Sequence, residues 1–313
     1  MKNIIFIGTA VFSAYILLRS IKKKYNIKTI ITKEDKIKGR NLNLNYIHIK
    51  KIAYLYAVQI QQPKKINIDL INTIRFKKIK LIIVSAYGKL LPENLLNIPI
   101  YKCINIHPSL LPKYRGPTPI ETAILNGELE TGLTIYKMDK YFDTGPILYQ
   151  KKIPIKIEDS SKIIEKNLSK LGFNALRQVI KKIVKNNKPK AQQSIDTTIY
   201  DTKIILKKDA KIKWCSTTNV ILNIIRAYQI KQKAYTIVQN KKVIIHKAIK
   251  NIENNTTKKP GTVEITTYNK VIVYTCTGTI ELKEIQIEAE KKIKIEHLLC
   301  KKFKLFYNGL ILN

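Results

Sequence analysis

The sequence predicts two domains, an α/β domain with a Rossmann-like open sheet and a smaller C-terminal domain resembling an OB-like β-barrel. The chain has 313 residues, which exceeds the roughly 250 that a single hydrophobic core usually serves. Short apolar runs alternate with helical segments in its first part, whereas closely spaced strand-like runs dominate its last eighty residues. We therefore place the domains at 1–188 and 204–313, with 189–203 as a linker.

The N-terminal segment has the pattern of a buried strand followed by a helix. The apolar run 4–7 ends at Gly8-Thr9, and 11–23 continues as a helix. The longer apolar stretch 4–18 also has the length of a secretory signal, but Gly8-Thr9 interrupts it, so we favour strand, turn and helix. The turn has no GxGxxG motif, so a dinucleotide site is not supported.

The next elements continue the alternation. Residues 28–32 form a second predicted strand. The segment 33–41 is polar and basic and has neither a helical nor a strand period of apolar residues, which is typical of a solvated surface loop. A helix is expected over 46–56, and the apolar core of 80–88 predicts a central strand.

A pair of polar side chains stands at the end of the following strand. Residues 102–107 alternate, so Asn105 and His107 project to one face while Ile104 and Ile106 project to the other. Pro108 ends the strand just beyond them. Open α/β sheets bind their ligands at the carboxyl ends of strands, so this pair is a candidate site.

An amide and an imidazole at such a position suit acyl transfer to an amine. Attack on a carbonyl carbon builds negative charge on its oxygen, and two positioned donors stabilise that charge. A carboxylate such as Asp143, brought close by the fold, would hold the His107 ring and help relay the proton that the amine loses. No nucleophilic side chain is needed. Taken alone, a strand-end histidine is more often a hydrogen-bonded core residue.

The rest of the first domain follows the same rules. Residues 117–126 predict a helix capped by Gly127, and strands are expected over 133–138 and 147–153. Ser160 caps a long helix that extends to about residue 184, whose apolar stripe is core.

The second domain begins with basic residues around Trp214, a packing anchor, and a helix over 220–228. Five short strands follow, at 234–238, 242–249, 261–265, 271–274 and 279–286. Five short strands predict a partly open barrel, which is a common nucleic-acid platform.

Composition adds a weak indication of a polyanionic partner. The chain has 58 Lys and Arg against 22 Asp and Glu, a net charge of +36, but the lysines also crowd segments without any motif. The four cysteines form no CxxC pair and three of the four histidines are isolated, so neither a metal site nor a disulfide framework is indicated, as expected in a reducing cytosol.

The string NIHPSLLPKYRG at 105–116, followed by Asp143-Thr144-Gly145, resembles the folate-dependent formyltransferases. The resemblance implies that Asn105, His107 and Asp143 are catalytic. It also implies 10-formyltetrahydrofolate as cosubstrate, no metal, and a folate loop made of Ser109, Leu110, Leu111 and Pro112.

The length and the basic segment 33–41 resemble the branch of this family that formylates methionyl initiator tRNA for translation initiation. In that branch a basic loop after the second strand enters the acceptor stem, which implies RNA contacts for Lys36, Lys38 and Arg40. The expected partner is initiator methionyl-tRNA, and the expected protein is a cytoplasmic monomer without membrane association.

Two alternatives stay open. One is an enzyme like glycinamide ribonucleotide formyltransferase, a shorter single domain that needs no barrel. The other is a non-catalytic RNA-binding protein on a degenerate formyltransferase scaffold. It is suggested by Tyr141, where the family normally has a glycine two residues before the catalytic aspartate. A bulky residue there favours a different turn before Asp143.

Overall fold

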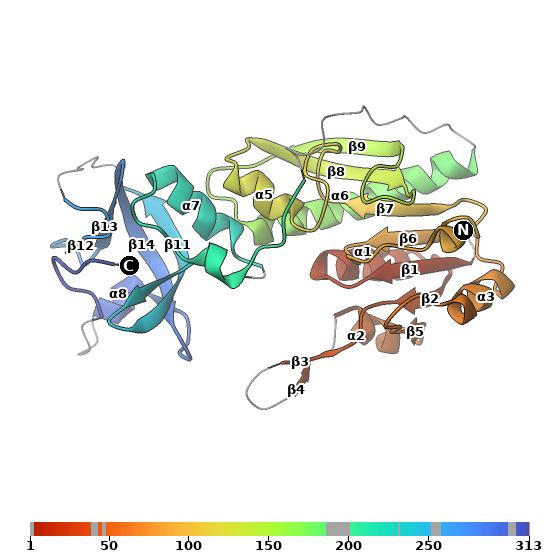
Figure 1. The fold of residues 1–313 in the computed structure, drawn as a ribbon, viewed down its shortest axis with the longest axis horizontal. Helices are drawn as coiled ribbons and strands as arrows, with labels where there is room; N and C mark the ends of the chain where they lie inside the picture. Colours follow the sequence, from red (N-terminus) through yellow and green to blue (C-terminus); the bar gives the residue numbers. More distant parts are fainter. Residues whose placement is uncertain are drawn as a thin grey trace. The chain divides into compact units, whose positions relative to one another are not determined.

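The computed structural model describes residues 3–38, 43–45, 48–185, 201–230, 232–251, 258–299 and 305–312. The chain divides into two compact units (Figure 1). The first unit comprises Met1–Pro119, Glu130–Pro154 and Glu165–Lys203, and the second comprises Ile120–Leu129, Ile155–Ile164 and Ile204–Asn313. Two short stretches that lie between segments of the first unit, 120–129 and 155–164, thus belong to the second unit.

A seven-stranded sheet organises the first unit, in the order β5-β2-β1-β6-β7-β8-β9. The first five of these strands are parallel and the last two antiparallel. Their bounds are β1 Ile4–Gly8, β2 Ile27–Ile31, β5 Gln59–Gln61, β6 Leu81–Ser85, β7 Cys103–His107, β8 Glu130–Lys137 and β9 Ile147–Pro154. All residues of β1 and β6 are buried, as expected of strands that are central in a parallel sheet.

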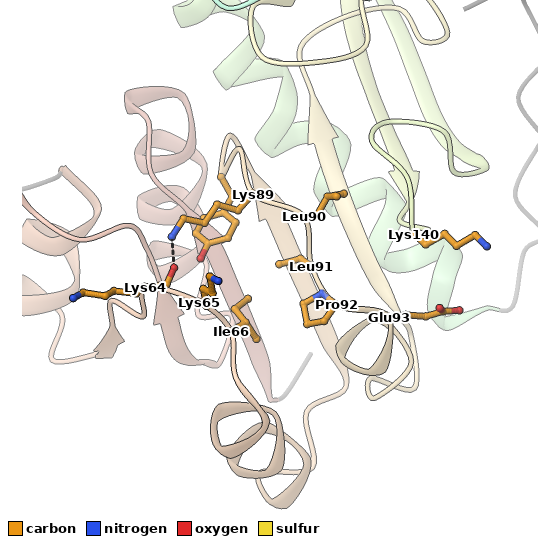
Figure 2. Close-up of a pocket in the computed structure, with 10 residues that line it drawn as sticks. Lys64, Lys65, Ile66, Lys89, Leu90, Leu91, Pro92, Glu93 and Lys140 are labelled. Carbon is orange, nitrogen blue, oxygen red and sulfur yellow. Dashed lines mark hydrogen bonds between the residues drawn. The ribbon is translucent and has the colours of Figure 1, made fainter.

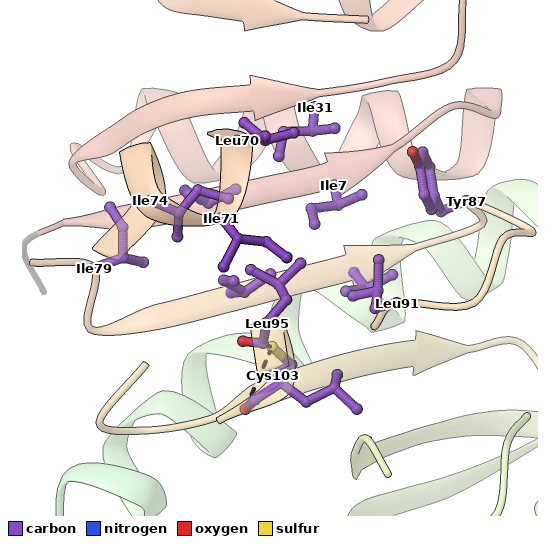
Figure 3. Packing of buried hydrophobic residues seen from close by; sticks show 14 residues of the cluster. Ile7, Ile31, Leu70, Ile71, Ile74, Ile79, Tyr87, Leu91, Leu95 and Cys103 are labelled. Carbon is purple, nitrogen blue, oxygen red and sulfur yellow. Dashed lines mark hydrogen bonds between the residues drawn. The ribbon is translucent and has the colours of Figure 1, made fainter. Parts of the chain in front are cut away.

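Apolar side chains on both faces of this sheet pack against helices. Ile7 and Ile31 pack with Leu70 and Ile71 of helix α3 in one buried cluster (Figure 3). On the other face, Gly172 of α6 approaches Ile106 of β7 and Ile16 of α1. The helices of this unit are α1 Val11–Lys22, α2 His48–Leu55, α3 Ile68–Phe76, α4 Glu93–Leu96 and α6 Ser161–Val184, the first turn of which belongs to the second unit. Helix α5 Pro119–Leu125 belongs to the second unit apart from Pro119.

The second unit is built on a smaller antiparallel sheet in the order β10-β11-β14-β13-β12, with β15 paired to β14. Register shifts beside Lys247 in β11 are bulges of the kind that bend a strand, and the sheet has an OB-like half-barrel form. Buried Trp214 donates from Nε1 to Thr236 Oγ1 at 3.0 Å, as expected of a packing anchor. The elements are α7 Thr218–Ala227, β10 Tyr235–Val238, β11 Lys241–Lys250, β12 Val263–Ile265, β13 Val271–Thr275, β14 Gly278–Ile287, β15 Ile293–Lys294 and α8 Ile295–Leu299.

Both predicted architectures are confirmed, and each predicted strand and helix is present with its ends shifted by a few residues. The prediction that 33–41 is an irregular loop was partly wrong. Within it, β3 (Lys36–Lys38) pairs antiparallel with β4 (Asn43–Asn45). The short strand β5 and the helix α3 were not predicted. The predicted linker 189–203 lies outside the described residues apart from 201–203.

The apolar stretch at the N-terminus is accounted for by β1 and α1, so the strand, turn and helix interpretation is confirmed. In the described part of the chain, no helix is both long and apolar enough to span a membrane. The described residues also contain no group of three or more His, Cys, Asp or Glu side chains that could hold a metal ion. Burial raises the pKa of the Cys103 thiol to about 12, which leaves it an unreactive core side chain.

Candidate active site

Asn105 and His107 lie at the carboxyl end of β7, on one face of the strand. The neighbours Ile104 and Ile106 are buried in the core on the opposite face. The alternation of side chains along the strand therefore places Asn105 and His107 together, as the sequence predicts. His107 is itself buried, with 4% of its surface exposed, and Asn105 is half-buried. The strand therefore delivers an amide and an imidazole side by side.

Asp143 reaches this pair from the turn between β8 and β9. Its Oδ2 lies 3.6 Å from His107 Nδ1 and accepts a hydrogen bond from the Gly116 backbone N–H at 2.7 Å. Its Oδ1 lies 3.4 Å from Asn105 Nδ2. The structure thus brings together the side chains of Asn105, His107 and Asp143, although Asp143 is far from the other two in the sequence.

The turn that carries Asp143 accommodates the unusual Tyr141. The Tyr141 side chain is 62% exposed, and its backbone N–H donates to Asp139 Oδ1 at 3.1 Å. Thr144 Oγ1 donates to the same oxygen at 2.7 Å, so Asp139 organises the turn. A Cβ at Gly145 would lie 1.8 Å from the Lys137 carbonyl oxygen, which only glycine avoids. The bulky residue points outward and does not keep Asp143 from His107.

Both ring nitrogens of His107 lie against acceptors. Nε2 is 2.9 Å from the carbonyl oxygen of Tyr114, and Nδ1 faces the Asp143 carboxylate. A carbonyl oxygen can only accept, so Nε2 carries a proton in this arrangement. Tyr114 sits in the left-handed region with φ of 61°. The segment that follows β7 thus folds back over the imidazole and places a carbonyl oxygen on it.

Tyr136 belongs to the same cluster, although it was not predicted from the sequence. It lies in β8 directly opposite Asn105, with 1% of its surface exposed. Its hydroxyl donates to Asp143 Oδ1 at 2.7 Å and accepts from Asn105 Nδ2 at 2.9 Å. Burial, followed by the nearby Asp143 charge, raises the pKa of Tyr136 well above its usual value, so it is a neutral phenol. Only the register between β7 and β8 could have revealed it.

The predicted folate loop is tied internally to β8 and β9. Ser109 Oγ donates to the Lys113 carbonyl at 2.7 Å, and the Ser109 carbonyl accepts from Thr134 Oγ1 at 2.7 Å. The backbone of Leu111 contacts Thr134 Oγ1 at 3.1 Å and Gln150 Nε2 at 2.8 Å. Ser109 and Leu111 are buried, whereas Leu110 and Pro112 are half-buried. Ser109 and Leu111 therefore hold the loop in shape. That the four residues of the loop contact folate stays a prediction.

A cavity of about 460 Å³ opens at the loop after β6 and shares the β8–β9 turn with Asp143 (Figure 2). Its wall combines apolar side chains with four lysines. The Tyr87 hydroxyl is a buried polar atom without a hydrogen-bond partner among the described residues, and Lys89 Nζ donates to the Lys64 carbonyl at 2.7 Å. The lining residues are Lys64, Lys65, Ile66, Tyr87, Lys89, Leu90, Leu91, Pro92, Glu93 and Lys140. The predicted folate loop, 109–112, is not among them.

The predicted RNA contacts fall where the structure says little. Lys36 and Lys38 lie in β3, where only the backbone pairing is described, and Arg40 lies outside the described residues. Their role as RNA contacts stays a prediction.

Two family models match this chain and cover both units. The model described as formyl transferase matches residues 1–180, and the model for the formyl transferase C-terminal domain matches residues 204–302. The chain belongs to the formyltransferase family. The string at 105–116, the Asp143 turn and the two-domain organisation are therefore features of a formyltransferase.

Similar proteins span nearly the full chain. A methionyl-tRNA formyltransferase of Caldanaerobacter subterraneus subsp. tengcongensis is 34% identical over 299 residues, covering 95% of this chain and 96% of its own. One of Thermodesulfovibrio yellowstonii is 38% identical over 292 residues, covering 93% and 92%. Among solved structures, WlaRD, a sugar 3N-formyl transferase in the presence of dTDP and 5-N-formyl-THF, is similar with a TM-score of 0.64 and 26% identity. That match covers 93% of this chain and 99% of WlaRD.

Proposed function

We propose that this formyltransferase transfers the formyl group of 10-formyltetrahydrofolate to the α-amino group of methionyl initiator tRNA, and so supports translation initiation. The observation that carries the chemistry is the 3.6 Å approach of Asp143 Oδ2 to His107 Nδ1, beside Asn105 at the end of β7. The acceptor is supported by relatives named methionyl-tRNA formyltransferase that match more than nine-tenths of the chain, C-terminal domain included.

The proposed catalytic residues are Asn105, His107 and Asp143. The neutral amine attacks the formyl carbon, the new N–C bond forms, and the bond from that carbon to the folate nitrogen breaks. The amine loses one proton and the folate nitrogen gains one, so the step balances. His107 donates from Nε2 to the formyl oxygen as charge develops there, and Asp143 faces the other ring nitrogen.

The Tyr114 carbonyl supports this assignment of His107. It lies 2.9 Å from Nε2, the distance and direction that an oxyanion would take on the ring. In the proposed reaction the formyl oxygen replaces this carbonyl as the acceptor on Nε2.

The cavity beside the Asp143 turn fits the folate cosubstrate. A reduced folate has a flat hydrogen-bonding ring at one end and an anionic glutamate at the other. The apolar wall of Leu91 and Pro92 suits the first, and the lysines suit the second. The Tyr87 hydroxyl, which has no hydrogen-bond partner among the described residues, offers the ring a polar contact. When bound, the folate supplies the activated formyl group.

The lysines of this cavity provide a test. In the double variant Lys65→Gln/Lys140→Gln, KM for the formyl donor should rise about threefold to tenfold with kcat nearly unchanged, because two exposed cations facing an anion contribute only modestly. Steady-state kinetics with varied donor measures this effect. Lys28→Gln, an exposed lysine outside the cavity, is the matched control. An unchanged KM would remove the cavity from consideration as the folate site.

The basic loop after β2 provides a test of the tRNA partner. We propose that Lys36, Lys38 and Arg40 contact the acceptor stem, as the family resemblance implies. Arg40→Ala should raise KM for charged initiator tRNA about tenfold and make binding less steeply dependent on salt, by about one unit of the log–log slope. Donor affinity should not change. Identical tRNA kinetics at two salt concentrations would contradict a role for this loop.

Three further features complete the proposal. The catalytic domain comprises residues 1–188, 189–203 is a linker, and 204–313 is a tRNA-binding domain. The protein acts as a monomer in the cytoplasm, where both substrates are present. No resident metal takes part in the proposed transfer.

One experiment separates the proposed function from its rivals. Formyl-labelled 10-formyltetrahydrofolate is incubated with the protein, charged initiator tRNA and glycinamide ribonucleotide as a competing acceptor. Label on the methionyl-tRNA is the expected result. Label on the nucleotide would identify an enzyme like glycinamide ribonucleotide formyltransferase. Binding of tRNA without any transfer would identify a non-catalytic RNA-binding scaffold.

A further inference from the structure

Tyr136 links two of the proposed catalytic side chains through a single hydroxyl group. The phenol lies 2.7 Å from Asp143 Oδ1 and 2.9 Å from Asn105 Nδ2. Asp143 Oδ2 meanwhile accepts from the Gly116 backbone, so the carboxylate accepts at both oxygens, as an ionised group does. A carboxylate cannot donate, so the single hydroxyl proton of Tyr136 points at Asp143.

This direction of donation fixes the amide of Asn105. With its proton committed to Asp143, the hydroxyl can only accept from Asn105, so the NH₂ end of the amide must face it. The reverse orientation would place the amide oxygen against two acceptors, the hydroxyl lone pair and Asp143 Oδ1 at 3.4 Å. Asn105 Oδ1 is then left as a buried acceptor without a hydrogen-bond partner among the described residues.

A buried acceptor without a partner is costly, unless a ligand supplies the missing donor. The attacking amine of the proposed reaction is such a donor, since it carries N–H groups. The sequence predicts that the nitrogen of Asn105 meets the substrate oxygen; the hydrogen-bond network instead leaves the Asn105 oxygen for the substrate nitrogen.

We propose that Tyr136 is a positioning residue for formyl transfer, which locks Asn105 with its Oδ1 available to accept from the attacking amine. The inference rests on the proposed function. Tyr136 acts through Asn105 and Asp143 and does not itself touch the reacting atoms. Its buried phenol stays neutral at physiological pH, which keeps the proton on the Tyr136 hydroxyl, where it is donated to Asp143 Oδ1.

Tyr136→Phe keeps the ring that fills the core and removes only the hydroxyl. The expected result is a fall in kcat of about 10- to 100-fold, with KM for the formyl donor unchanged within about twofold. In an Asn105→Ala background the same substitution should lower kcat by less than about threefold, because the group it positions is gone. Tyr149→Phe, on the neighbouring strand β9, is the matched control and should retain full activity.

Two results would overturn the assignment. One is a kcat of Tyr136→Phe equal to that of the unmodified protein. The other is a loss of kcat in the double variant equal to the product of the losses in Tyr136→Phe and Asn105→Ala. A merely structural role would raise the donor KM and lower the melting temperature of Tyr136→Phe, and it would act equally in both backgrounds.

A second measurement needs no substitution at Tyr136. The side-chain amide protons of Asn105, identified by their absence in Asn105→Ala, should exchange slowly with solvent in the unmodified protein, since Nδ2 donates inward. Rapid exchange would overturn the inference. This test does not depend on turnover, so a failure of the proposed function, seen as no transfer by the unmodified protein, is distinguishable from a failure of the Tyr136 assignment.

Discussion

His107→Ala is expected to lower the turnover of formyl transfer by about 10²- to 10⁴-fold, the range found when an acid–base or oxyanion-stabilising group is removed. The substitution removes the Nε2 donor that the proposed mechanism directs at the formyl oxygen. It also removes the ring that Asp143 faces at 3.6 Å. Single-turnover transfer of labelled formyl to charged initiator tRNA measures the chemical step directly.

The fold should survive this substitution, because the other groups of the cluster keep partners. Asp143 retains its hydrogen bonds from the Gly116 backbone and from Tyr136. Binding of initiator tRNA should persist, since the predicted RNA contacts lie elsewhere. His48→Ala, an exposed histidine in α2, is the control. A His107 variant that binds tRNA and keeps its turnover would refute the assigned chemistry.

The parts of the fold that were predicted carry their signals locally. The apolar run of β1, the alternation of β7 and the apolar stripe of α6 are each legible within a few residues. The missed β5 is a three-residue edge strand, Gln59–Gln61, whose polar ends resemble a loop. Likewise β3 and β4 have no apolar alternation beyond one central residue each, so only their pairing makes them strands.

The site divides in the same way. Asn105 and His107 are two apart on one strand, so their common face follows from the pleat. Tyr136 is 31 residues from Asn105 and meets it only because β7 and β8 pair in one particular register. The Tyr114 carbonyl on His107 and the four-lysine cavity arise from loops, whose paths no sequence period encodes.

The Asp143 turn lies between these cases. The motif Asp143-Thr144-Gly145 gives its chemistry, and Tyr141 predicted a different turn. The outcome depends on Asp139, whose carboxylate accepts from the Tyr141 backbone and from Thr144, and on Tyr141 pointing to solvent. Because the Tyr141 side chain points to solvent, the turn does not need a glycine at this position. The departure from the family pattern therefore leaves the approach of Asp143 to His107 intact.

Asp143→Asn is expected to lower turnover at least about 10²-fold although it changes one atom of the side chain. The carboxylate accepts at both oxygens, from Tyr136 on one and from the Gly116 N–H on the other. An amide has one acceptor and one donor, so its NH₂ must oppose one of these donors, or the Tyr136 hydroxyl must turn away from it. The carboxylate that faces His107 Nδ1 at 3.6 Å is lost as well.

Stability and activity should respond differently to this change. A buried mismatch of one hydrogen bond costs about 1–3 kcal/mol of unfolding free energy, a loss a folded domain tolerates. Chemical denaturation should therefore show a moderately weakened protein, while transfer kinetics show a far larger defect. Asp69→Asn, on the exposed first turn of α3, controls for the loss of charge alone. If the Asp143 variant is weakened but transfers formyl within tenfold of the parent, the carboxylate serves the fold and His107 acts without it.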